Sequence, residues 1–97
     1  MELDIPVKYR KDIETAANLL KNEGCRSVYL FGSMVTGKIR DESDIDIGIK
    51  GLPPESFFRV YAKLDNNLLN DVDLIDFDEN NKLYNLLNSL GEVIEIG

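Results

Sequence analysis

The sequence predicts an α/β domain, in which a mixed β-sheet carries helices mainly on one of its sides. Three observations support this class. Apolar stripes at helical spacing alternate along the chain with short runs rich in β-branched and aromatic residues. One of these runs, residues 43–49, alternates strictly between apolar and polar side chains. The 97 residues suffice for one modest hydrophobic core but not for two, so we expect a single domain over residues 1–97.

The first half of the chain is expected to form a helix, a strand and a helical turn. An apolar stripe between a proline and a glycine predicts a helix over residues 7–23, because proline favours a helix start and glycine a helix end. Residues 27–31 have the composition of a strand. A brief helical turn is expected over residues 33–37, followed by a charged loop that reaches Glu42.

The second half repeats this alternation. The strict alternation over residues 43–49 predicts the clearest strand of the chain, and a proline-containing loop then opens a helix with an apolar stripe from Phe57 to Leu68. A third strand is expected over residues 71–77, a helix over 79–90 and an edge strand over 92–96. The leucines of the last helix are expected to pack in the core, with an exposed seam for a partner left open. They are Leu83, Leu86, Leu87 and Leu90.

Composition excludes several classes of function. The chain has no histidine, which removes histidine acid–base catalysis and most zinc sites. Its formal net charge of −7 disfavours direct contact with nucleic acid, because such a surface repels phosphate backbones. A single cysteine, Cys25, indicates a reducing cytoplasm. We expect no signal peptide and no membrane-spanning segment, because the chain lacks the basic and apolar regions that these need.

The residues that indicate chemistry lie in and before the alternating strand. Gly32 and Ser33 form a turn, and ten residues later Asp44 and Asp46 stand two positions apart. Residues i and i+2 of a strand share a face, so the two carboxylates would lie side by side and repel each other unless a cation neutralises them. Mg²⁺ favours such ligands together with substrate phosphates. Gly32 lets a phosphate approach the backbone, and Ser33 adds a hydroxyl and the free N–H groups of a helix start.

The third strand supplies another carboxylate. Asp73 is central in an apolar run, where a carboxylate is costly without a partner, while Asp71 and Asp76 lie nearer the ends and are expected to face water. If this strand neighbours residues 43–49, Asp73 joins Asp44 and Asp46 around the same ions. A bound triphosphate would then meet the hydrogen-bond donors of the turn on one side and the carboxylate-bound metal on the other. This arrangement predicts two-metal transfer of a nucleotidyl group to a hydroxyl, with pyrophosphate leaving.

The pattern of a Gly-Ser pair, ten residues, Asp-x-Asp and a later strand aspartate resembles the nucleotidyltransferases of the DNA polymerase β superfamily. The short length resembles the minimal nucleotidyltransferase (MNT) branch. The resemblance implies that Asp44 and Asp46 bind two Mg²⁺ ions, and that Asp73 binds one of them and positions or deprotonates the attacking hydroxyl. It also implies that Gly32 and Ser33 hold the β- and γ-phosphates of ATP.

This family resemblance implies a function in a toxin–antitoxin pair. MNT proteins are often encoded with a helical HEPN toxin, and some transfer AMP from ATP to a tyrosine of that toxin, so we expect an antitoxin of this kind that forms homo- or hetero-oligomers. One alternative is an antitoxin that neutralises its partner by binding without catalysis. A less favoured alternative is a subunit that modifies a small molecule. Family members often carry an arginine soon after the Gly-Ser pair, whereas Lys38 and Arg40 here are expected to be solvated loop charges.

Overall fold

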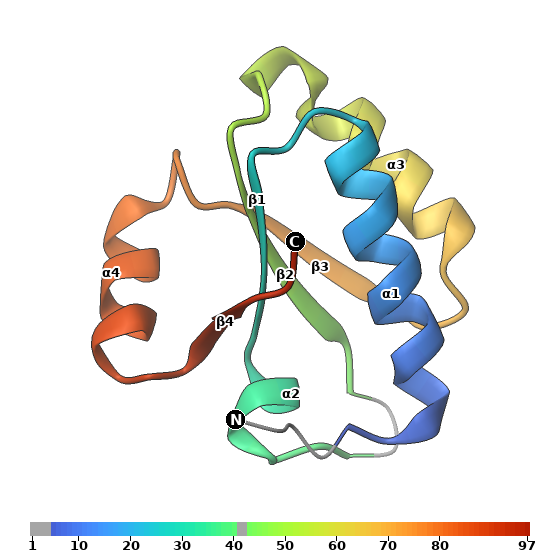
Figure 1. Ribbon diagram of the computed structural model, residues 1–97, viewed down its shortest axis with the longest axis vertical. Helices are drawn as coiled ribbons and strands as arrows, with labels where there is room; N and C mark the ends of the chain where they lie inside the picture. Colours follow the sequence, from blue (N-terminus) through green and yellow to red (C-terminus); the bar gives the residue numbers. More distant parts are fainter. Residues whose placement is uncertain (1–4, 41–42) are drawn as a thin grey trace.

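The computed structural model describes residues 5–40 and 43–97 and shows one four-stranded sheet flanked by helices (Figure 1). The signal-peptide expectation rests partly on residues 1–4, and the expected charged loop includes Asp41 and Glu42; these lie outside the described residues. The elements in chain order are α1 (Val7–Asn22), β1 (Ser27–Phe31), α2 (Ser33–Thr36), β2 (Ile45–Lys50), a 3₁₀ turn η1 (Pro54–Ser56), α3 (Phe57–Asn67), β3 (Val72–Asp76), α4 (Asn81–Ser89) and β4 (Val93–Glu95). Each predicted element is present, with ends that differ by a few residues.

The sheet is mixed, as predicted, and its strands are ordered β3-β2-β1-β4. β1 runs antiparallel to both β2 and β4, whereas β2 and β3 run parallel. The connection from β2 to β3 passes through α3, as a parallel pair requires. The predicted edge position of the last strand is confirmed, and the parallel pair places the two carboxylate-bearing strands side by side.

The two faces of the sheet are covered differently (Figure 1). Helices α1 and α3 lie together on one face, whereas α4 lies alone on the other. Ile45, Ile47 and Ile49 point to the α1–α3 face and are fully buried there. The alternation of β2 therefore leaves Asp46 and Gly48 on the α4 face. None of the helices in residues 5–40 and 43–97 is long and apolar enough to cross a membrane.

The leucine stripe of α4 is divided, with Leu83 and Leu87 half-buried and the other two leucines exposed, so the expectation that it packs in the core is wrong and the exposed seam that was left open is present. Leu86 and Leu90 are 56% and 59% exposed, and no residue of α4 is fully buried. Tyr84 makes the main contact instead, with its ring 5.2 Å from that of Tyr29 and 5.3 Å from that of Phe77. The reason is geometric: α4 has no neighbouring helix on its face of the sheet, so only one narrow side of it is covered.

The carboxylates of β3 also differ from expectation. Asp76, expected to face water, is buried at 7% exposure, whereas Asp73 is exposed. Asp76 shares its face with Leu74, which packs toward α3, while Asp73 points to the opposite face. The side-chain alternation of the strand therefore decides which carboxylate is buried, and distance from the strand end does not.

Candidate active site

The Gly-Ser turn connects β1 to the short helix α2. Gly32 has φ +73°, a left-handed conformation that glycine adopts without strain. Its carbonyl accepts hydrogen bonds from the N–H groups of Val35 and Thr36, both at 3.0 Å. The turn ends at Gly37, whose N–H donates to the Ser33 carbonyl at 2.9 Å. The predicted helical turn is confirmed, and Ser33 is its first residue.

Gly32 lies directly against the carboxylate of Asp46. Phe31 and Asp46 are opposite each other in the antiparallel pair of β1 and β2, which places the next residue, Gly32, beside that side chain. A Cβ atom at position 32 would lie 2.9 Å from the Asp46 Cγ and would overlap the carboxylate oxygen. Glycine is therefore required here for two reasons, its backbone conformation and the space that Asp46 occupies.

The three predicted carboxylates gather at the start of β2 and β3. Asp46 and Asp73 are direct partners in the parallel register, and both point to the face opposite the α1–α3 core. Asp44 immediately precedes β2 and is exposed, as is Asp73, whereas Asp46 is half-buried. The topology thus brings the later strand aspartate to the Asp-x-Asp pair, as the sequence predicted.

The electrostatics of this group favour a bound cation. The pKa of Asp46 is raised to about 6, first because burial removes the carboxyl from water and second because Asp73 and Asp44 repel its charge. Hard oxygen donors that repel one another are suited to Mg²⁺. Residues 5–40 and 43–97 contain no three His, Cys, Asp or Glu side chains arranged as a ready-made metal site. Mg²⁺ would therefore need water or substrate phosphate to complete its coordination, which is usual for this ion.

The loop before β2 is held by neutral groups. Ser43 Oγ accepts a hydrogen bond from the Arg40 N–H at 2.7 Å, and the buried Tyr9 hydroxyl donates to the Arg40 carbonyl at 3.4 Å. The side chains of Lys38 and Arg40 are exposed, as expected of solvated loop charges. Ser43 therefore supports the loop that leads to Asp44.

Asp12 is a supporting residue that the sequence reasoning missed. It is 2% exposed, and its carboxylate accepts hydrogen bonds from the Leu69 N–H at 3.0 Å and from the backbone and side-chain N–H groups of Asn70 at 2.7 and 2.9 Å. The backbone carbonyl of the next residue, Asp71, accepts a hydrogen bond from the Ile45 N–H at 2.9 Å. Asp12 thus holds residues 69–70, the segment that leads into β3, against α1. The same segment continues to the contact between Asp71 and the start of β2. The sequence does carry a signal for this residue, because Asp12 lies within the apolar stripe of α1, where a carboxylate is unexpected without hydrogen-bond donors.

The fold and the site together define a class of protein. A sheet that places carboxylates of two neighbouring strands beside a glycine-serine turn is the arrangement expected of a nucleotidyl-transferring domain. Residues 14–94 match the family described as "Polymerase beta, Nucleotidyltransferase". The chain therefore belongs to the polymerase beta nucleotidyltransferase family. The comparison with curated proteins gives no significant match.

Solved structures extend the comparison. A chain of a toxin–antitoxin crystal structure with AMP-PNP is 32% identical, with a TM-score of 0.55 over 70% of this chain and 56% of that one. A chain from the tri-AMPylated Shewanella oneidensis HEPN toxin in complex with MNT antitoxin is 27% identical, with a TM-score of 0.51 over 71% and 56%. A chain of a MntA-HpeT toxin–antitoxin mutant is 24% identical, with a TM-score of 0.67 over 88% and 71%, and shares the fold. The chain thus spans little more than half the length of the first two relatives.

Proposed function

We propose that this chain is a Mg²⁺-dependent nucleotidyltransferase that transfers AMP from ATP to a tyrosine hydroxyl of a HEPN toxin, and so acts as its antitoxin. The observation that carries this proposal is the position of Asp46, between the bare backbone of Gly32 on one side and Asp73 on the other. Relatives of similar sequence are described with AMP-PNP and with an AMPylated HEPN toxin, which supports the same donor and acceptor here.

The proposed roles follow from these positions. Asp44, Asp46 and Asp73 would hold the metal, which would neutralise phosphate charge and stabilise the attacking and leaving oxygens. The backbone at Gly32 and Ser33 would hold the terminal phosphates of ATP. Asp73, the exposed member of the group, would orient the tyrosine hydroxyl and take its proton. The tyrosine oxygen then bonds to the α-phosphorus, and the bond to the β-phosphate oxygen breaks, so that pyrophosphate leaves.

The proposed compartment is the cytoplasm, which supplies ATP and Mg²⁺ and keeps a thiol reduced. Cys25 is the only cysteine of the chain and is a free, buried thiol. The proposed assembly is a hetero-oligomer with the toxin. The chain has 18 acidic residues against 11 basic ones, which favours a protein acceptor over a nucleic acid.

The test is label transfer from α-³²P-ATP to a HEPN-type protein encoded beside this chain, with Mg²⁺ present. We expect labelled partner with the unaltered chain and with Asp65→Asn, an exposed control on α3. Asp46→Asn and Asp73→Asn should each reduce the rate at least 100-fold. Absence of label with every variant would refute the transferase. Neutralisation of the partner by Asp46→Asn as effectively as by the unaltered chain would instead favour an antitoxin that acts by binding alone.

A further inference from the structure

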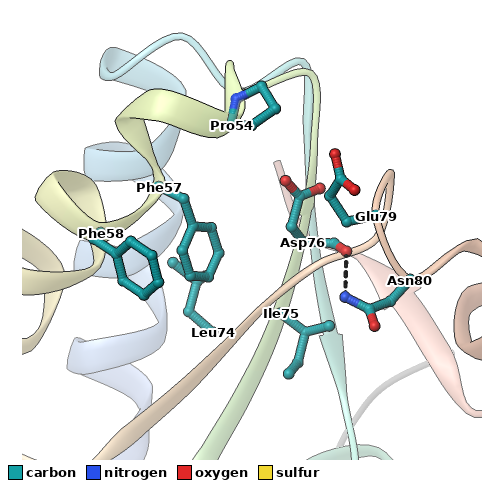
Figure 2. Close-up of a pocket in the computed structure, with 8 residues that line it drawn as sticks. All are labelled: Pro54, Phe57, Phe58, Leu74, Ile75, Asp76, Glu79 and Asn80. Atoms are coloured by element: carbon teal, nitrogen blue, oxygen red, sulfur yellow. Dashed lines mark hydrogen bonds between the residues drawn. The ribbon is translucent and has the colours of Figure 1, made fainter.

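A second feature of β3 is a pocket at the far end of the strand (Figure 2). It has a volume of about 320 Å³ and lies between the start of α3 and the end of β3. Asp76, at its end, points to the α1–α3 face of the sheet, whereas Asp73 points to the opposite face. The lining includes neither the Gly-Ser turn nor any of the three predicted carboxylates. We call this cavity the β3 pocket.

The β3 pocket combines apolar walls with carboxylates. Phe57 and Phe58 form one wall, and Leu74 and Ile75 contribute from β3. The other lining residues are Pro54, Asp76, Glu79 and Asn80. Figure 2 shows the two carboxylates on the side of the pocket toward Pro54. The lining contains no lysine or arginine, so the pocket carries negative charge without a cation of its own.

Asp76 is the less usual of the two acids, because it is buried. Its side chain is only 7% exposed, and one oxygen accepts a hydrogen bond from the Asp78 N–H at 2.9 Å. Within residues 5–40 and 43–97, ion pairs form only at Glu23, so Asp76 and Glu79 have no ion-pair partner there. A carboxylate removed from water is stabilised mainly by a cation or by further donors.

The walls indicate what kind of cation fits. A metal ion is disfavoured, because most of the lining is apolar and only two carboxylates are present. A lysine or arginine side chain has an aliphatic stem that suits Leu74 and Phe57, and a charged head that suits Asp76 and Glu79. Arginine fits better, because its planar group also stacks on aromatic rings. Phe58 is 83% exposed at the pocket, so its ring is accessible to a guanidinium group that binds there.

We propose that the β3 pocket binds an arginine side chain of a partner protein. The stem lies along the Phe57 and Leu74 surfaces, and the guanidinium donates hydrogen bonds to Asp76 and Glu79. This contact lies outside the catalytic carboxylates and does not depend on AMP transfer. It would add a docking point at the β3 edge of the sheet.

The experiment is an NMR titration of the ¹⁵N-labelled chain with N-acetyl-arginine methylamide. N-acetyl-citrulline methylamide, of the same shape but uncharged, is the control ligand. We expect saturable amide shifts at residues 55–58 and 74–80, at least tenfold weaker binding of the citrulline compound, and no change in arginine binding when ATP and Mg²⁺ are added. Equal binding of the two compounds, or arginine shifts confined to the surroundings of Asp46, would overturn the proposal.

Variants make the assignment specific. Glu79→Gln, at an exposed position, and Asp76→Asn should each weaken arginine binding at least fivefold. Glu14→Gln, an exposed change on α1, should leave it unaltered. If Asp76→Asn fails to give a folded spectrum, Glu79→Gln alone decides. Unchanged binding in Glu79→Gln would overturn the role of the carboxylates.

Discussion

Replacement of Asp46 by asparagine should stabilise the metal-free chain at neutral pH. The pKa of Asp46 rises from 3.8 to about 6 in the folded protein, so folding disfavours the charged form. At about 1.4 kcal/mol per pKa unit, a fully buried group would cost about 3 kcal/mol. Because Asp46 is only half-buried, water screens part of this effect, and we expect about 1–2 kcal/mol. Asparagine has nearly the same shape and no charge, so it should remove this cost.

The sign of the pH dependence follows from the direction of the shift. A carboxyl whose folded pKa is raised costs nothing below about pH 4, where it is protonated in both states. The cost develops between about pH 4 and pH 6 and is complete above the folded pKa. The gap between Asp46→Asn and the unaltered chain should therefore be absent near pH 4 and widest above pH 6.

The assay is urea unfolding followed by circular dichroism in EDTA, from pH 4 to pH 8. Asp65→Asn is the matched control, since this exposed aspartate should change the free energy of unfolding by less than about 0.5 kcal/mol. Equal stability of Asp46→Asn and the unaltered chain at pH 7.5, or a gap independent of pH, would refute the reasoning. A destabilised variant would mean that the carboxylate makes favourable contacts that outweigh its repulsion.

Three further predictions follow from the same structure. Gly32→Ala should lower the free energy of unfolding, measured in urea, by about 2–4 kcal/mol, because alanine is strained at a positive φ and its Cβ would overlap the Asp46 carboxylate. A decrease of less than about 1 kcal/mol would contradict this. Asp12→Asn should lower the free energy of unfolding by about 1–3 kcal/mol and speed hydrogen exchange at the Leu69 and Asn70 amides. Unchanged exchange would argue against the proposed hold of Asp12 on these amides. Burial raises the pKa of the Cys25 thiol to about 11, so alkylation at pH 8 should be about 100-fold slower than in the urea-unfolded chain; equal rates would contradict it.

The sequence predicts the fold well where a single period controls burial. Ile45, Ile47 and Ile49 alternate with polar residues, and the structure buries all three on one face. The same alternation predicts the face of Asp46, and the parallel register with β3 then brings Asp73 beside it. Local pattern therefore predicts the face of Asp46, whereas the position of Asp73 beside it depends on the pairing of β2 with β3.

The sequence fails where burial depends on what lies above an element. The leucines of α4 have helical spacing, yet Leu86 and Leu90 stay exposed because no second helix covers that face. Asp76 lies on the same side of β3 as Val72 and Leu74, as the alternation of the strand requires, but its burial depends on the covering of that side by α3, a separate element. Asp12 is buried because a distant segment, residues 69–70, supplies its hydrogen-bond donors. These outcomes depend on contacts between residues far apart in the chain.

One geometric fact links the stability of the site to its proposed chemistry. Gly32 has no side chain, so the Asp46 carboxylate can lie against the turn that is proposed to hold phosphate. The same closeness takes Asp46 out of water, and Asp73 and Asp44 add repulsion, which together raise its pKa. A cation with a bound triphosphate would relieve that repulsion and satisfy the turn at once. The repulsion that raises the pKa of Asp46 would therefore favour a bound cation, and the neighbouring turn would favour the phosphates that such a cation carries.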